Sequence, residues 1–341
     1  MAFRLSVLDQ SPIPAGSTAG DALRNTLDLA RLADRLGYHR YWLAEHHGTP
    51  GLACNSPEVM IGPVAAATSR IRVGSGGIML PHYSPLKVFE SFSMLSGLYP
   101  GRIDLGLGRA PGTSSKVAHA LQRDRRHPLP DDFREQLDEL LGYIKNGEPE
   151  PYLLGSSPQS AVWAAELGLP YVFADFINPA GEPYAAFYRE HFVPSARPHA
   201  PHEPQVAVCA WAVCADTTEE AVRLSASARM MMLLLFRGKL IAVPPVEQAL
   251  EFLAHESAPL EALPAHRRVI PGDPVTVRAA LEDLARDYHA DEVFVVNILY
   301  SHASRLRSYE LLADAFRSRR PAAGRQYVND NIGPRRLCVK N

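Results

Sequence analysis

The sequence has few cysteines and little net charge. Its four cysteines, Cys54, Cys209, Cys214 and Cys338, include no C-x-x-C pair and no ladder of close spacings, so neither a disulfide scaffold nor a cysteine metal site is expected. A net charge of −2 over 341 residues supplies no basic surface for nucleic acid or for an anionic membrane. The expected partners are therefore small molecules or other proteins.

Membrane-spanning and export signals are lacking as well. The longest apolar run, Met230 to Phe236, is far shorter than the roughly 20 residues that a spanning helix needs. The N-terminal MAFRLSVLDQ enters an alternating strand pattern at once and has no hydrophobic signal region. Together with the unpaired cysteines, these features predict a cytoplasmic protein that makes no contact with a membrane.

Strand-like and helix-like segments alternate along the chain. The eight expected strands cover residues 4–9, 39–45, 70–80, 102–108, 151–157, 169–176, 204–216 and 290–300. Each is followed by a segment with helical features, such as 20–37 and 131–147. This arrangement predicts an α/β fold of the TIM (β/α)8 barrel type. A doubly wound parallel sheet is the alternative, because alternation alone does not separate the two folds.

Two connections are too long to be simple loops of a barrel. Residues 109–131 and 236–272 are therefore expected to form extended βα loops that act as lids over the barrel mouth. The barrel is expected to be a single domain over residues 1–317, with residues 318–341 as a C-terminal extension.

The stretch AEHHGTPG, residues 44–51, places Glu45, His46 and His47 where the second strand ends. Active sites of TIM barrels form at such carboxyl ends. Successive strand residues point to opposite sides, so His46 and His47 cannot share a metal ion, and neither H-x-H nor H-E-x-x-H occurs. No metal is predicted. A histidine that titrates near neutral pH suits proton transfer, whereas the structural alternative is a pair that only satisfies backbone groups.

Glycines gather at the ends of the third and fourth strands. GSGG covers residues 74–77, and GLGRAPG (106–112) places Gly108 directly before Arg109. Glycines let a flat ligand approach the backbone, and an arginine suits a phosphate or an anionic ring. The spacing does not match the dinucleotide pattern G-x-G-x-x-G. The structural alternatives are a bulged strand end and a glycine-rich turn with a surface arginine.

A serine-rich helix start follows the fifth strand. In GSSPQSA (155–161), Ser157 is the expected N-cap, Pro158 occupies the first turn and Ser160 follows. Free N–H groups and hydroxyls converge at such a start, which can bind an anion; alternatively the serines only cap the helix.

Several blocks, in series over residues 3–316, resemble the bacterial-luciferase-like flavin monooxygenases. The blocks are LSVLDQSP, YWLAEHHGTPG, RIRVGSGGIMLPHYSPLKVFE, GRIDLGLGRAPGT, LLGSSPQSAVWAAELGLPYVFADF and RSYELLA. The resemblance implies a TIM barrel that uses reduced FMN and molecular oxygen. It also implies a homodimer through barrel helices. Because no second nucleotide-binding signature is present, a separate NAD(P)H:flavin reductase is expected to supply the reduced FMN.

The resemblance also assigns roles to single residues. His46 resembles the catalytic histidine of the family, with Glu45 and His47 as supporting groups. Gly76 and Gly77 match the place where the family often has a non-prolyl cis peptide under the flavin ring. The implied cofactor-binding residues are Gly76, Gly77, Gly108, Arg109, Ser156, Ser157 and Ser160. Luciferase itself has a cysteine at the position of Gly108, and this departure argues against light emission.

The implied reaction passes through a C4a-peroxyflavin or hydroperoxyflavin, with His46 handling its proton. The deprotonated form attacks a carbonyl, and the protonated form delivers an electrophilic oxygen. An aromatic polyketide or other secondary metabolite is the expected substrate, with a long-chain aldehyde as the alternative. Two rival functions share the fold: a hydride-transfer oxidoreductase that uses the deazaflavin F420, and a flavin-binding protein without catalysis.

Overall fold

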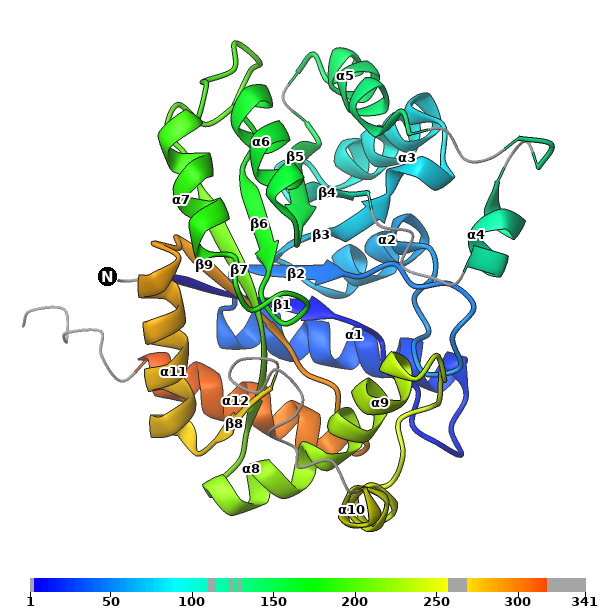
Figure 1. Ribbon diagram of the computed structural model, residues 1–341. Coiled ribbons are helices and arrows are strands. Elements are labelled where there is room, and N and C mark those ends of the chain that lie inside the picture. The colour runs from blue at the N-terminus through cyan, green and yellow to red at the C-terminus, as the bar shows by residue number, and fades with distance from the viewer. Residues whose placement is uncertain are drawn as a thin grey trace, which may run out of the picture.

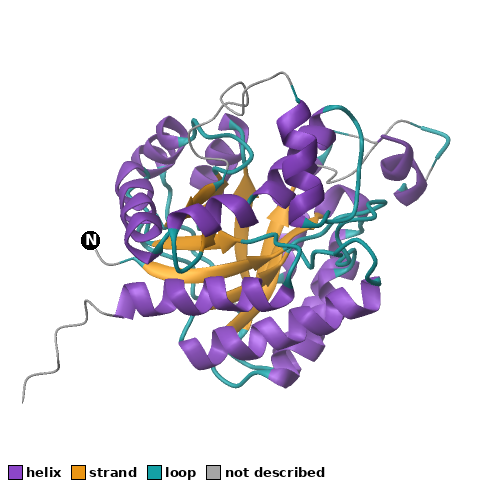
Figure 2. Ribbon diagram, turned by 90° about the horizontal axis from the view of Figure 1, so that it is seen from below, coloured by secondary structure: helices purple, strands orange, loops and turns teal. Residues whose placement is uncertain are grey.

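Parallel strands form a closed barrel that helices surround (Figures 1 and 2). The computed structural model describes residues 3–109, 115–122, 125–127, 131–146, 148–256 and 269–317. The barrel strands are β1 (Arg4–Asp9), β2 (Arg40–Leu43), β3 (Arg72–Met79), β4 (Ile103–Gly108), β5 (Glu150–Gly155), β6 (Tyr171–Ala174), β7 (Val206–Cys214) and β9 (Glu292–Val296). Each of β1 to β6 pairs in parallel with the next, and β6–β7, β7–β9 and β9–β1 pairings close the ring. The predicted eight-stranded TIM barrel is confirmed.

The helices begin and end on the signals that the sequence carries. The helices that follow the first six strands are α1 (Ala19–Leu36), α2 (Pro57–Ala67), α3 (Pro85–Leu98), α5 (Phe133–Tyr143), α6 (Pro158–Leu167) and α7 (Glu182–His191). Thr18 and Asp21 form a capping box at the start of α1, and Gly37 ends that helix in the left-handed conformation at φ 82°. No helix in the described ranges is long and apolar enough to cross a membrane.

The two long connections contain elements that were not predicted. Helix α4 (Ser115–Leu121) lies in the first, and α10 (Val246–His255) and β8 (Ile270–Gly272) lie in the second. Strand β8 pairs only with β7 and stands outside the barrel ring. The expected C-terminal extension from residue 318 lies outside the described residues.

The sequence predicts one helical segment after the strand at 204–216, and the structure has two helices there. The segment after β7 breaks at Ser225 into α8 (Thr218–Leu224) and α9 (Ala226–Phe236). The Ser225 hydroxyl donates to the Val222 carbonyl at 2.7 Å, a local bond that competes with the regular helix. The chain then closes with α11 (Pro274–Asp287) and α12 (His302–Arg317).

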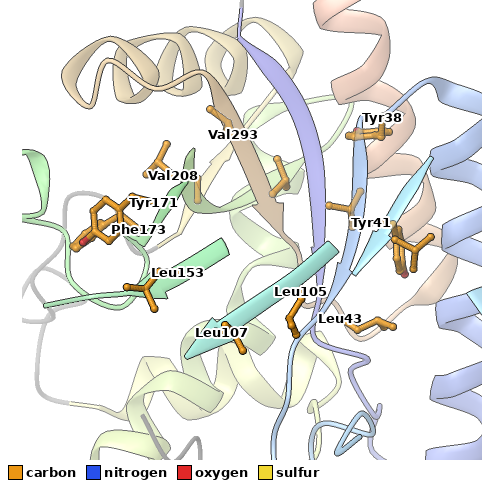
Figure 3. Close-up of a cluster of buried hydrophobic side chains, with 14 of the residues drawn as sticks. Tyr38, Tyr41, Leu43, Leu105, Leu107, Leu153, Tyr171, Phe173, Val208 and Val293 are labelled. Atoms are coloured by element: carbon orange, nitrogen blue, oxygen red, sulfur yellow. The ribbon is translucent and has the colours of Figure 1, made fainter. Parts of the chain in front are cut away.

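The core has two layers because successive strand residues face opposite sides. Tyr41 and Leu43 of β2 pack outward against the helices in the large cluster of which Figure 3 shows a part. Trp42 points into the barrel, where its ring lies 4.9 Å from that of Tyr152 and 4.4 Å from that of Phe294. This inner aromatic layer fills the barrel below its carboxyl-end mouth.

A buried charged layer, which was not predicted, closes the amino-end of the barrel. It is built from the first or second residues of five strands: Arg40, Arg72, Asp104, Glu150 and Glu292. Arg40 donates through Nη1 to Asp104 at 2.8 Å and through Nε to Glu292 at 3.2 Å. Arg72 donates through Nε to the other Asp104 oxygen at 2.8 Å. The interior charges of this layer are therefore paired with one another.

Candidate active site

The end of β2 separates His46 from its two neighbours. Trp42 and Ala44 belong to the inner cluster, and the same alternation, continued past the end of β2 at Leu43, assigns His46 to the inner side at the barrel mouth. Its backbone N–H donates to the Cys54 carbonyl at 3.0 Å, which fixes this position. Glu45 lies on the outer side, together with His47. The opposition of His46 and His47 stays a prediction from this alternation.

Glu45 and His47 tie the end of β2 to the end of β3. The buried Glu45 carboxylate is 2.7 Å from His47 Nε2 and accepts bonds from the Met79 N–H at 3.0 Å and the Tyr83 hydroxyl at 2.9 Å. Met79 ends β3, and Tyr83 follows the short 3-10 turn η1 (Leu80–His82). Both residues therefore brace the loop that carries His46. The described ranges contain no group of three or more metal-ligating side chains.

The environment of His46 keeps its ring neutral. Burial and the nearby His47 lower the pKa of His46 to about 4. Its Nδ1 atom is shielded from solvent and has no hydrogen-bond partner. Buried polar atoms are nearly always paired, so an unpaired one in a barrel mouth points to a ligand. His46 can therefore accept or hold a proton on a molecule bound there.

Strands β3 and β4 present backbone, without side chains, to the inside of the barrel near the mouth. Their inward positions above the charged layer are Gly74, Gly76, Gly106 and Gly108. A Cβ on Gly106 would lie 2.1 Å from the Ser75 carbonyl oxygen, because β3 shifts register between Ser75 and Ile78 and its backbone approaches β4. The peptide bond from Gly76 to Gly77 is cis. These glycines form a side-chain-free wall, in which a Cβ on Gly74, Gly76 or Gly106 would come within 2.5 Å of another protein atom.

Arg109 follows β4 directly and extends toward α6. Its guanidinium lies 5.6 Å from the centre of the Trp163 ring, and Nη2 is 2.6 Å from Asp131 Oδ1. The side chain is half exposed, so it can turn toward an anion. Arg109 therefore lies on the side of the mouth that faces α6.

The start of α6 has free donors at its first turn. Ser157 is the N-cap, as predicted, but its side chain makes no capping bond, and Pro158 occupies the first turn. The neighbouring Ser156 carbonyl accepts a bond from Asn178 at 3.0 Å. Ser160 is turned inward, donates to the Ser157 carbonyl at 2.6 Å and lies 3.1 Å from the Tyr171 hydroxyl. Of the three predicted serines, Ser160 is buried and hydrogen-bonds the backbone of the turn, and Ser157 is exposed to solvent.

Loops after β1 and β2 and the segment after α9 are joined at the rim. Ile13 donates to the Gly51 carbonyl at 2.8 Å, and Val243 donates to the Ile13 carbonyl at 2.9 Å. Val243 falls in the connection predicted to be a lid, so part of that connection is fixed against the barrel. From the apolar run Met230 to Phe236, Met232 is buried in the barrel interior, and Phe236 is exposed.

The sequence interpretation missed the aromatic and apolar residues on the far side of the mouth. Trp211 is an inward residue of β7, and partly buried side chains pack around the same inner cluster: Leu52, Leu154, Phe176, Met231 and Tyr300. The alternating pattern of β7, in which Cys209 and Trp211 share one face, was the available signal.

Comparison with known proteins gives one consistent family. The family described as "Luciferase-like monooxygenase" matches residues 3–287. A protein of that same description from Escherichia coli (strain K12) is 40% identical over 91% of this chain and 96% of its own length. The N-acetyl-S-alkylcysteine monooxygenase of Bacillus subtilis (strain 168) is 37% identical over 92% of this chain and 98% of its own. The solved structure of apo-MsnO8 is 40% identical, with a TM-score of 0.86 over 93% of this chain and 99% of that one.

More distant solved structures share the fold alone. The oxygenating constituent of 3,6-diketocamphane monooxygenase from Pseudomonas putida, solved in complex with FMN, is 20% identical, with a TM-score of 0.73 over 93% of this chain and 99% of that one. An F420-dependent secondary alcohol dehydrogenase is 14% identical, with a TM-score of 0.62 over 93% and 99%. The barrel itself therefore occurs with either cofactor.

Proposed function

This chain belongs to the luciferase-like monooxygenase family, and from that premise we propose that it uses reduced FMN and molecular oxygen to oxygenate a small organic molecule. The observation that carries the proposal is the composition of the mouth. A side-chain-free wall on β3 and β4, a half-exposed Arg109 and the uncapped start of α6 lie in succession around one arc, and His46 faces the same mouth from β2.

These residues fit FMN in chemistry and in shape. At Gly76 and Gly77 the backbone carries no side chain that would keep a flat ring system away from it. The phosphate end of FMN suits Arg109 and the first turn of α6, which includes Ser157. Ser156, whose carbonyl accepts the bond from Asn178, lies beside this turn. Bound reduced FMN would supply the electrons that activate oxygen.

The chain itself would position reactants, exclude water and hold a proton. The layer around Trp42 closes the barrel beneath the mouth and keeps solvent from entering there. His46, neutral in its buried setting, would accept a proton through Nδ1 or return it. Glu45 and His47 would act as positioning residues through the bonds that brace the end of β2.

Partners and substrate are part of the same proposal. A separate NAD(P)H:flavin reductase would supply the reduced FMN, and two copies of the chain would form a homodimer. For the substrate we propose a small organic molecule with an apolar part, such as the S-alkyl chain of an S-alkylated cysteine whose carboxylate lies at its other end. An N-acetyl-S-alkylcysteine is the first to try, because the relative of that name is 37% identical to this chain. An aromatic secondary metabolite is the second.

Anaerobic titration with reduced FMN and, separately, with reduced F420, followed by rapid mixing with oxygen, tests the proposal. We expect tight binding of FMN and an oxygen-dependent absorbance transient. Arg109→Ala should weaken FMN binding by about tenfold. Arg125→Ala, an exposed arginine in the same long connection, is the matched control and should leave binding unchanged.

His46→Ala separates chemistry from binding. It should alter the lifetime of the transient while the affinity for FMN stays near that of the unmodified protein. Hydride transfer with F420 in the absence of any oxygen-dependent transient would reassign the chemistry. Binding of FMN without turnover of any substrate tried would favour the flavin-binding alternative.

A further inference from the structure

We propose that the indole N–H of Trp211 selects the substrate by donating a hydrogen bond to a neutral acceptor oxygen on an otherwise apolar molecule. This inference rests on the proposed function, because it assigns the side of the mouth that the flavin would leave open. It names the substrate class by its chemistry: an apolar body with a carbonyl-type oxygen at its buried end.

The strand order sets Trp211 apart from the residues suited to FMN. Those residues come from β3, β4 and β5, which are consecutive in the barrel, whereas β7 lies across the ring from β3 and is separated from β5 by β6. Trp211 is opposite Val296 of β9 in the parallel ladder, so it lies near the carboxyl end of its neighbour. A second reactant bound beside β7 and β9 would face the flavin across the mouth.

The Trp211 donor is buried and has no partner. The side chain is 7% exposed, and its Nε1 atom has neither solvent contact nor a hydrogen-bond partner. The other inward indole of the barrel is satisfied, because Trp42 donates to Asp104 at 2.8 Å. The fold thus pairs one interior indole and leaves the one nearer the mouth free for a ligand.

The surroundings of Trp211 favour a neutral, apolar ligand. The ring of Phe176 lies edge-on at 6.5 Å, and Met231 and Tyr300 pack against the same inner cluster. Cys209, on the same face of β7, stays uncharged because burial raises the pKa of its thiol. Within the described residues, the paired interior carboxylates and guanidinium groups of the charged layer stand at the opposite end of the barrel. At the carboxyl end, the buried carboxylates of Asp9 and Asp175 already have partners, because Asp9 pairs with Arg305 at 2.6 Å and Asp175 accepts a bond from the Tyr288 hydroxyl at 2.7 Å.

Equilibrium dialysis with acetophenone and ethylbenzene tests the donor, since the two differ chiefly in one acceptor oxygen. The measured quantity is the ratio of the two dissociation constants, with and without bound FMN. Trp211→Phe keeps an aromatic ring and removes the N–H, so the preference for acetophenone should fall by about tenfold. Phe176→Leu, which removes a neighbouring ring and no donor, should weaken both ligands by similar factors. Trp211→Leu replaces Trp211→Phe if the latter does not fold.

Each other outcome overturns the inference. An unchanged ratio in Trp211→Phe means that the indole does not select the oxygen, and failure of both probes to bind means that the arc is not a site for such molecules. If Trp211→Phe lowers the affinity for FMN and leaves the ratio of the two dissociation constants unchanged, the indole N–H binds the flavin instead of the substrate. The proposed function is tested separately, because FMN binding to the unmodified protein is measured in the same dialysis experiment. If Trp211→Phe changes the ratio of the two dissociation constants but the unmodified protein does not bind FMN, the Trp211 site is supported and the FMN enzyme is rejected.

Discussion

His46 differs from its neighbours by one step of strand alternation. Glu45 and His47 turn outward and bond each other, whereas His46 turns toward the mouth and keeps an unpaired, shielded Nδ1. The ring is desolvated, so its neutral form is the stable one in the folded protein. A negative charge bound nearby would raise the pKa of His46 again, which is the behaviour that proton transfer at neutral pH requires.

The lowered pKa of His46 predicts a pH-dependent stability. In the unfolded chain a histidine titrates near 6.5, and in the folded protein the pKa of His46 is about 4. Between these values the unfolded state binds a proton that the folded state does not, so stability is lost as the pH falls from 6.5 to 4. His46→Gln should flatten this part of the curve of unfolding free energy against pH, measured by urea denaturation.

His39 provides the comparison for that experiment. Burial and the nearby Arg40 and Arg4 also lower the pKa of His39 to about 4, far from the mouth. His39→Gln should flatten the same window, and the double variant should be flatter than either single one. A slope that His46→Gln leaves unchanged would contradict a neutral, buried His46.

At the scale of elements, the sequence predicts those features that local chemistry decides. The Ser-Pro start of α6 and the end of α1 at Gly37 lie where the sequence predicts them, because helix ends depend on the residues at the ends themselves. The break at Ser225 was missed, since a helical pattern continues through it and only the bond to Val222 reveals the break.

The charged layer was missed for a different reason. A charge at the first position of a strand reads as solvent-exposed in the sequence, and only barrel closure brings five such positions together. The side chain of Arg40 joins β2 to β4 through Asp104 and to β9 through Glu292. Its removal takes one of two guanidinium partners from Asp104 and leaves the buried Glu292 carboxylate with Arg4 at 4.0 Å.

We therefore expect Arg40→Met to lower the free energy of unfolding by about 3–5 kcal/mol, as measured by chemical denaturation. Arg40→Met combined with Glu292→Gln should recover part of that loss, because the second change removes one uncompensated charge. Arg223→Met, which breaks an exposed pair with Glu220, should cost no more than about 1 kcal/mol. Equal losses in Arg40→Met and Arg223→Met would show that the buried layer is not what stabilises the barrel.

At the scale of the whole molecule, the fold was predictable and half of the mouth was not. Eight strand patterns were enough for the barrel, because its closure needs only their number and order. The glycines, Arg109 and His46 stand out as short motifs in the sequence. Trp211 does not, since an aromatic residue in a strand is ordinary, and its significance comes from an unpaired N–H that only packing reveals.

The outer surface supports the proposed homodimer. Val59 on α2 and Met94 and Leu98 on α3 are 66%, 69% and 70% exposed, and α2 and α3 are neighbours in the ring of helices (Figure 1). Exposing large apolar side chains to water is unfavourable, and covering them with a second copy of the chain is favourable. We therefore propose these two helices as the surface through which two copies associate.

Sedimentation velocity over a range of concentrations tests the dimer. We expect the unmodified protein to sediment as a dimer and Met94→Glu with Leu98→Glu to shift it toward the monomer, because two charges would be buried at the interface without partners. Val275→Glu is the matched control: Val275 is 79% exposed on α11, away from this surface, so its replacement should leave the dimer intact. A monomeric unmodified protein would reject the dimer. A dimer that persists in the double variant would move the interface to other helices.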